Sequence, residues 1–155
     1  MRRAYFDSGL GRLRGWFGLG VLLLIAAGLG AAGAELPQSD RPEDAQLYFV
    51  TPGQGDTLTS PFVVRFGLKG MGVAPAGVEK AGTGHHHLIV DAVLPPSGGP
   101  IPASDHYRHF GKGQTEVTLD LEPGEHTLQL ILGDHFHIPH DPPLVSKRIS
   151  ITVTK

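Results

Sequence analysis

The chain of 155 residues contains no cysteine, and it has only two methionines and one tryptophan. Without cysteine the protein can form neither a disulfide nor a thiolate metal site, and its leader offers no cysteine for lipid attachment. The two methionines, Met1 and Met71, are too few for a methionine-rich copper(I) site. Any metal site must therefore be built from imidazole, carboxylate or backbone oxygen ligands.

Basic residues are not in excess either, since 13 Lys and Arg stand against 15 Asp and Glu. The sequence has no basic cluster of the kind that binds nucleic acid or an anionic membrane surface. Serine is scarce and the G-x-S-x-G motif of a serine nucleophile is absent. No glycine-rich loop joins a strand to a helix, as a phosphate-binding loop would. We therefore expect no nucleic-acid partner, and no nucleophilic residue can be named.

Residues 1–34 have the features of an export signal. Arg2, Arg3, Arg12 and Arg14 precede an apolar run over residues 16–29, and Ala-Gly-Ala at 32–34 matches a small-residue cleavage site. We expect cleavage to leave Glu35 as the N-terminus of a periplasmic or secreted protein. An uncleaved single-pass anchor is the alternative, but the run is shorter than the ~20 residues that a membrane span needs. No stable membrane span is therefore expected after cleavage.

Residues 46–155 predict one all-β domain with one core, preceded by a polar linker or loose arm over residues 35–45. No segment has a sustained helical period, and proline and glycine turns separate short runs of β-branched, aromatic or alternating apolar residues. These runs predict about seven strands, at 46–50, 61–68, 85–91, 106–110, 115–121, 126–132 and 145–153. Such a pattern is typical of an antiparallel β-sandwich with an immunoglobulin-like fold.

Histidine is the residue type that stands out. All nine histidines lie between His85 and His140, and most of them fall in three clusters: His85 to His87, His106 with His109, and His135 with His137 and His140. Residues two apart in a strand point to the same face. The pairs His85/His87 and His135/His137 can therefore each offer two imidazoles to one ion, and imidazole suits zinc, copper and nickel.

The expected fold brings these two pairs together. In an immunoglobulin-like sheet the strands at 85–91 and 126–132 are antiparallel neighbours, so the start of the first lies beside the end of the second. If Leu88 and Val90 face the core, His85 and His87 face away from it and His86 packs inward. A slip of one residue in the register would exchange the two faces.

We predict His85, His87, His135 and His137 as the metal ligands, with His140 and His109 as further candidates. The acidic neighbours Asp134 and Asp141 could orient imidazoles, as second partners of ligating histidines do. The alternative is that these histidines cap turns or make structural hydrogen bonds in polar loops, which for His109 is as plausible as ligation.

His126 is expected to have a structural role. It occupies the corner before strand 126–132, where immunoglobulin-like folds carry a tyrosine that hydrogen-bonds back to the corner backbone. We therefore do not include His126 among the candidate ligands.

Four runs of sequence resemble one known family: GHHHLIVD (84–91), HFGKGQTEVTLDL (109–121), PGEHTLQLILGDHFHIPHDPP (123–143) and SKRISITV (146–153). They are similar to a group of small exported bacterial proteins classed as domain of unknown function, family 4399. The resemblance extends from about Leu47 to the C-terminus. It implies an exported β-rich domain with a repeated histidine pattern at positions 85, 87, 109, 126, 135, 137 and 140, and it implies no particular activity.

The leading hypothesis is thus a small exported domain that binds one copper or zinc ion through a histidine cluster. Two rivals remain open. The first is a structural or interaction module of the cell envelope, with a protein partner and without metal. The second is a metal-dependent enzyme that keeps an open coordination position and uses Asp134 or Asp141 as a base.

Overall fold

The computed structural model describes residues 37–155, so the predicted export signal at 1–34 lies outside the described residues. The described part of the chain is all-β, with nine strands and no helix. It therefore holds no helix that is long and apolar enough to cross a membrane. Two strands were not predicted, β2 (Thr57–Thr59) and β4 (Gly72–Val73), because runs of two or three residues are too short to display an alternating pattern.

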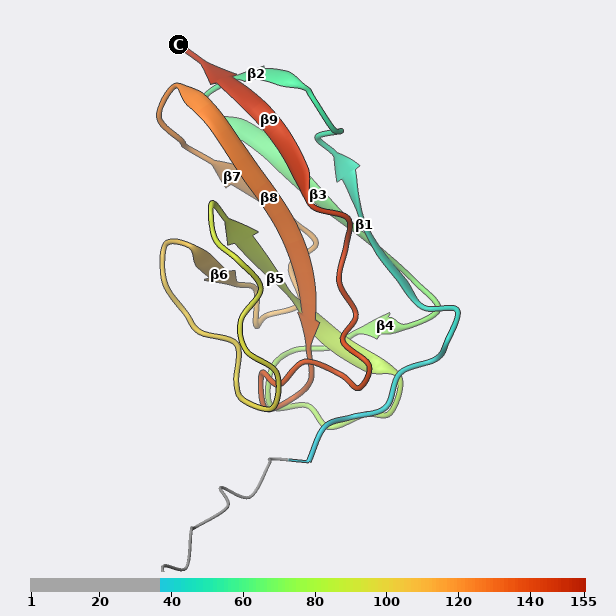
Figure 1. Cartoon of the computed structure of the whole chain (residues 1–155). Coiled ribbons are helices and arrows are strands. Elements are labelled where there is room, and N and C mark those ends of the chain that lie inside the picture. Colours follow the sequence, from blue (N-terminus) through green and yellow to red (C-terminus); the bar gives the residue numbers. More distant parts are fainter. Residues whose placement is uncertain (1–36) are drawn as a thin grey trace, which may run out of the picture. The chain divides into compact units, whose positions relative to one another are not determined.

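The strands form two sheets (Figure 1). The smaller sheet has the order β1-β3-β7, with β1 at Gln46–Thr51, β3 at Phe62–Lys69 and β7 at Glu116–Leu119. The larger sheet has the order β2-β9-β8-β5-β4, with β6 paired to β5; these strands are β5 (Thr83–Val90), β6 (Tyr107–His109), β8 (Gly124–Gly133) and β9 (Ile149–Thr154). The long strands pair antiparallel, whereas the short β2 and β4 pair parallel with β9 and β5.

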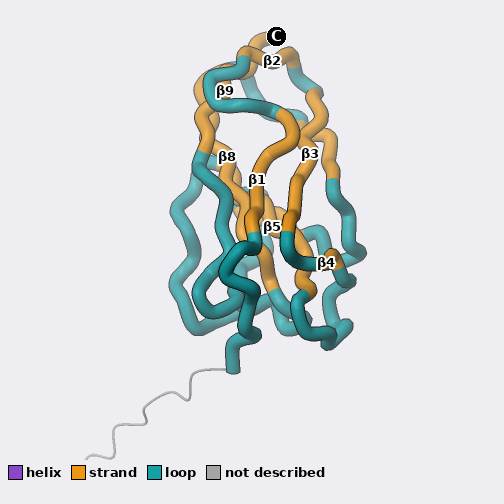
Figure 2. Tube along the Cα trace, turned by 90° about the vertical axis from the view of Figure 1, so that its right-hand side faces the viewer, coloured by secondary structure: helices purple, strands orange, loops and turns teal. Residues whose placement is uncertain are grey.

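The main hydrophobic core contains buried residues of both sheets. In β9 the buried residues Ile149, Ile151 and Val153 alternate with exposed ones, as a strand with one covered face requires. They pack with buried side chains of both sheets, among them Val64 of β3 and Leu128 of β8. Figure 2 shows β1 and β3 in front of β8 and β9. Each buried aliphatic side chain of this kind contributes about 1.5–3 kcal/mol to the free energy of folding.

The predicted pairing of the two histidine-bearing strands is confirmed. β5 and β8 are antiparallel neighbours, and His85 at the start of β5 lies opposite Gly133 at the end of β8. The predicted parity is also confirmed, because His86 and Leu88 are buried on the core side, where His86 packs on Phe66 of the smaller sheet. His85 and His87 therefore lie on the other face of β5.

That other face of β5 is covered by loops. Ile89 of β5 and Ile131 of β8 pack there with Ile101, which belongs to the segment between β5 and β6, and form a second, smaller cluster. The loops after β4, β5 and β8 run to the end of the domain away from the C-terminus (Figures 1 and 2). His85 and His87 are consequently buried, although they point away from the main core.

Candidate metal site

Four histidines converge on the loop-covered face of the larger sheet. His85, His87, His109 and His137, called here the four-histidine cluster, each place one ring nitrogen within 4.8 Å of the other three nitrogens. His85 Nε2 lies 3.0 Å from His137 Nδ1 and also 3.0 Å from His87 Nε2. The cluster thus contains members from two strands and one loop.

Strand geometry positions three members of the cluster. His85 and His87 are two residues apart in β5, so their rings share one face and their centroids lie 4.8 Å apart. His109 is the register partner of His87 in the antiparallel pair of β5 and β6. Its ring centroid lies 4.9 Å from that of His87 and 5.0 Å from that of His85.

A tight turn positions the fourth member, His137. β8 ends at Gly133, and the chain then reverses so that Gly133 forms an antiparallel bridge with Pro139. The carboxylate of Asp134 accepts hydrogen bonds from the backbone N–H groups of Phe136 and Ile138, which lie on either side of His137. His137 itself has a φ of 65°. This left-handed backbone directs its ring towards His85 and breaks the alternation of β8.

Two glycines leave room for the imidazoles. A Cβ atom at Gly133 would lie 3.0 Å from His87 Nε2, and a Cβ atom at Gly111 would lie only 2.3 Å from Cε1 of His109. The ring of His109 therefore rests against the backbone of Gly111. His85 and His87 are buried, His137 is partly buried and His109 is exposed, so the cluster meets solvent at the His109 side.

Burial lowers the pKa of three members of the cluster, His85, His87 and His109, and so keeps their imidazoles neutral. It lowers the pKa of His85 to about 4, with His137 and His109 adding to the effect and Asp134 opposing it. Burial, followed by the neighbouring His85 and His109, lowers the pKa of His87 to about 2. The pKa of His109 is lowered as well, by burial and by His137. At neutral pH these rings therefore carry lone pairs, which metal ligation requires.

The hydrogen bonds within the cluster are incomplete without an ion. An imidazole nitrogen has either one N–H or one in-plane lone pair, yet His85 Nε2 has two nitrogen neighbours at 3.0 Å. On the far side of the rings, Nδ1 of His85 and Nδ1 of His87 are buried without a partner among the described residues. A cation at the centre of the cluster would engage the lone pairs of all four rings at once.

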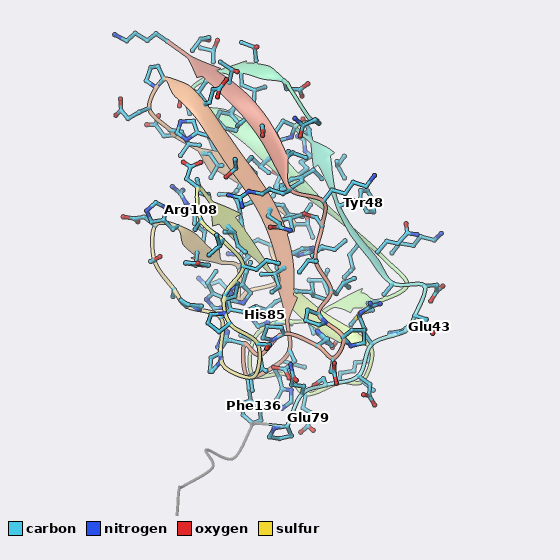
Figure 3. All side chains as sticks on the ribbon, in the orientation of Figure 1. Glu43, Tyr48, Glu79, His85, Arg108 and Phe136 are labelled. Carbon is cyan, nitrogen blue, oxygen red and sulfur yellow. The ribbon has the colours of Figure 1, made fainter. Side chains whose placement is uncertain are left out.

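His135 and His140, which were also predicted as ligands, are not part of this cluster. The ring of His135 packs on Phe136, with centroids 4.1 Å apart, and lines a separate cavity of about 250 Å³ beside Glu79 and Thr83. His140 is buried, and its Nε2 lies 3.2 Å from the carbonyl oxygen of Thr83. In Figure 3 Phe136 and Glu79 lie at the loop end of the domain, and His85 lies further inside, near the end of β8.

His126 has the structural role that was predicted for it. Its Nε2 lies 2.8 Å from the backbone carbonyl of Glu122, four residues earlier, and its Nδ1 lies 2.7 Å from a carboxylate oxygen of Asp91. His106 is also engaged outside the cluster, with Nδ1 2.8 Å from the carbonyl oxygen of Val90. Neither residue is near enough to the four-histidine cluster to join it.

From the sequence, His109 was a weaker ligand candidate than His135, and Ser39 carried no signal of a role at the site. The sequence indicated His109 only through its place on a neighbouring edge strand, because its register with His87 depends on the long connection between β5 and β6.

Asp134 was proposed as a partner of an imidazole. It instead uses one carboxylate oxygen for two backbone amides and the other for the hydroxyl of Ser39, at 2.9 Å. A side-chain contact between residues 95 positions apart leaves no local pattern in the sequence.

Comparison with known proteins agrees with the family resemblance seen in the sequence. No curated protein and no solved structure matches the chain. A known family matches residues 64–154, more than half of the chain, and this range includes every member of the four-histidine cluster. The chain therefore belongs to the family described as "Domain of unknown function (DUF4399)".

Proposed function

We propose that this domain binds one transition-metal ion, copper(II) or zinc, through His85, His87, His109 and His137. The observation that carries the proposal is the position of His85 Nε2, which lies 3.0 Å from a nitrogen of His87 and from a nitrogen of His137. The shared nitrogen carries one hydrogen or one lone pair, so only one of these two contacts can be a linear hydrogen bond. A bound cation resolves the conflict.

The spacing suits both metals. For metal–nitrogen bonds of about 2.0–2.1 Å, adjacent ligand nitrogens lie about 3.3 Å apart in a tetrahedron and about 2.9 Å apart in a square. The two distances of 3.0 Å fall between these values. Small rotations of the exposed His109 and the partly buried His137 would complete either arrangement.

The geometry favours binding over catalysis. Four imidazoles fill the tetrahedral set of zinc, whereas catalytic zinc sites use three protein ligands and keep one position open. Asp134, one of the two residues considered as a base beside Asp141, has both carboxylate oxygens engaged by Ser39 and by backbone amides. An ion would enter and leave at the exposed His109 side, which suits a carrier or a sensor of metal.

We further infer that the domain is an immunoglobulin-like β-sandwich that acts in the periplasm or outside the cell. Support for the sandwich comes from the main core shared by both sheets, the antiparallel pairing of β5 with β8, and the corner contact of His126 with Glu122. Support for export comes from the leader-like sequence of residues 1–34.

The proposal is tested by calorimetric titration of the purified protein, carrying no histidine tag, with copper(II) and with zinc. We expect one ion per chain. Removing a residue that only supports a metal ligand typically weakens binding by roughly 10–100-fold. His109→Ala removes a ligand itself and should weaken binding by more than this. The variant should keep its fold, because His109 is exposed. His106→Ala is the matched control, since His106 is exposed three residues earlier and lies outside the cluster.

The proposal fails if neither metal binds to the wild-type protein. It also fails if the His109→Ala and His106→Ala variants bind with the same affinity as the wild type. Circular dichroism of both variants, recorded with chelator present, confirms that any difference in affinity does not arise from unfolding.

A further inference from the structure

The chain before β1 is fastened to the turn that carries His137. The amide nitrogen Nε2 of Gln38 donates a hydrogen bond of 2.9 Å to the carbonyl oxygen of Pro139. The backbone N–H of Asp141 donates to the carbonyl oxygen of Ser39, and Asp40 forms a parallel bridge with Asp141. In Figure 1 this arm, the cyan segment at the start of the described chain, enters the domain at the end where the loops gather.

The side chain of Ser39 extends from the arm into the interior of the domain, where it contacts the buried Asp134. Its hydroxyl donates a hydrogen bond of 2.9 Å to Oδ2 of Asp134, whose side chain is almost fully buried, with 1% of the residue exposed. The other oxygen, Oδ1, accepts the N–H groups of Phe136 at 2.9 Å and Ile138 at 3.0 Å. Among the described residues, Ser39 supplies the only side-chain hydrogen bond to this carboxylate.

Asp134 in turn fixes the backbone on both sides of His137. The N–H of His137 donates to the carbonyl oxygen of Asp134 at 2.9 Å, and the N–H of Ile101 donates to the carbonyl oxygen of His137 at 2.8 Å. A non-glycine residue with a φ of 65° persists only where its surroundings over-determine the conformation. Here the hydrogen bonds of Asp134 and Ile101 provide that constraint.

We propose that the docked arm controls the metal affinity of the cluster, with Ser39 and Asp134 acting as positioning residues for His137. This inference rests on the proposed metal-binding function. The arm is connected to the cluster by a chain of hydrogen bonds. The Ser39 hydroxyl bonds the Asp134 carboxylate, and this carboxylate bonds the backbone of the turn that places Nδ1 of His137 beside His85. Detachment of residues 38–41, by proteolysis or by a partner that captures the arm, would loosen His137 and release the ion.

The first test compares Ser39→Ala with Ser60→Ala. Both substitutions remove a serine-to-aspartate hydrogen bond, since Ser60 Oγ donates to Asp120 Oδ1 at 2.8 Å in another part of the domain. With zinc and copper(II) as probes, Ser39→Ala should raise the dissociation constant on the order of tenfold, the lower end of the range for outer partners of metal ligands. Ser60→Ala should leave the dissociation constant unchanged.

The second test separates positioning from charge. Asp134→Asn keeps an oxygen for the two backbone amides and an NH₂ group that can donate to Ser39, but it removes the negative charge. We expect Asp134→Asn to bind within about threefold of the wild type, and Asp134→Ala to lose about 10–100-fold. Equal losses in Asp134→Asn and Asp134→Ala would overturn the positioning role.

Two further readouts do not depend on overall stability. In the copper(II)-loaded protein, electron paramagnetic resonance should reveal fewer coordinated nitrogens in Ser39→Ala than in Ser60→Ala. In the metal-free protein, the amide hydrogens of Phe136 and Ile138 should exchange faster in Ser39→Ala.

The outcomes distinguish the two proposals. If the wild type binds no metal, the proposed function is wrong, and the hydrogen-exchange comparison still tests whether Ser39 holds the turn. If the wild type binds metal and Ser39→Ala matches Ser60→Ala in affinity, spectrum and exchange, the proposed function stands and the control by the arm is refuted.

Discussion

His87 and His109 lie directly opposite each other in the antiparallel ladder of β5 and β6, with ring centroids 4.9 Å apart. His87 is buried, whereas His109 is exposed at the edge of the sheet. Side chains opposite each other in an antiparallel pair have Cβ atoms about 4.5–5.5 Å apart, so backbone register alone brings these imidazoles together. An exposed residue of an edge strand thereby completes a cluster that is otherwise covered.

Gly111 is predicted to be essential for this arrangement, although it offers no ligand atom. A Cβ atom at position 111 would lie 2.3–2.4 Å from Cε1 and Nε2 of His109, so Gly111→Ala must displace that ring from its position in the cluster. The exposed ring is free to move, and the variant should fold normally. We expect its metal affinity to fall towards that of His109→Ala, as measured by calorimetry.

Gly99→Ala is the control for this prediction, because a Cβ atom at Gly99 would meet no atom within 4 Å. The placement of His109 in the cluster is contradicted if Gly111→Ala and Gly99→Ala both bind metal as the wild type does.

The two histidines that flank Phe136 are predicted to differ sharply in effect. His137 Nδ1 lies 3.0 Å from His85 Nε2, whereas the ring of His135 packs on Phe136 outside the cluster. His137→Ala should therefore lose metal affinity by more than about 100-fold, and His135→Ala should retain it. Competition titration with a coloured zinc chelator measures both variants, and a larger loss in His135→Ala would exclude the present ligand set.

A first pH prediction concerns His86 in the main core. Burial, opposed by the backbone of Gln114, lowers the pKa of His86 to about 4, whereas in the unfolded chain it is about 6.5. Between these values the unfolded state binds more protons than the folded state, so the free energy of unfolding falls as the pH drops from 6.5 towards 4.

His86→Leu removes this titratable group and places an apolar side chain of similar size against Phe66. In metal-free protein its free energy of unfolding should fall less steeply below pH 6.5 than that of the wild type. Urea denaturation at half-unit pH steps, with chelator present, measures the two slopes. Parallel slopes would mean that His86 does not resist protonation in the folded state.

A second pH prediction has the opposite sign and concerns His126. Burial alone would lower its pKa, but the bonds to Asp91 and to the carbonyl of Glu122 outweigh this and raise it. Both partners are acceptors, so both bonds form only when the imidazolium donates from its two nitrogens. This stabilisation is complete below pH 6.5 and is lost as the pH rises through the raised pKa.

His126→Ala should therefore destabilise the domain more at pH 5.5 than at pH 8.5. Asp91 remains ionised at pH 5.5, because its bonds to His126 and to the backbone of Thr127 outweigh its burial and lower its pKa below the usual 3.8. Thermal unfolding at the two pH values provides the comparison, and equal destabilisation at both would refute the imidazolium contact.

The fold was predictable where hydrophobic alternation is strong. Leu128, Leu130 and Leu132 in β8 alternate over enough residues to define a strand and its buried face. The pairing of β5 with β8 followed from the expected order of strands, and it placed His85 beside the end of β8. The short strands β2 and β4, with their parallel pairings, could not be predicted because two or three residues carry no period.

The cluster was only partly predictable, because two of its members depend on backbone geometry that alternation does not encode. If β8 continued straight past Gly133, as the alternation in the sequence suggests, His135 and His137 would lie on one face. The carboxylate of Asp134 instead closes a turn in which His137 takes a left-handed conformation, so of these two histidines only His137 joins the cluster. His109 depends on register across the connection between β5 and β6, which only the folded loop determines.

The most direct test of the account is a crystal structure of the protein loaded with zinc or copper(II), with anomalous diffraction recorded on both sides of the metal absorption edge. The account predicts one anomalous peak per chain, about 2.0–2.1 Å from one ring nitrogen each of His85, His87, His109 and His137. A peak at His135 or His140, or no peak at saturating metal, would contradict it.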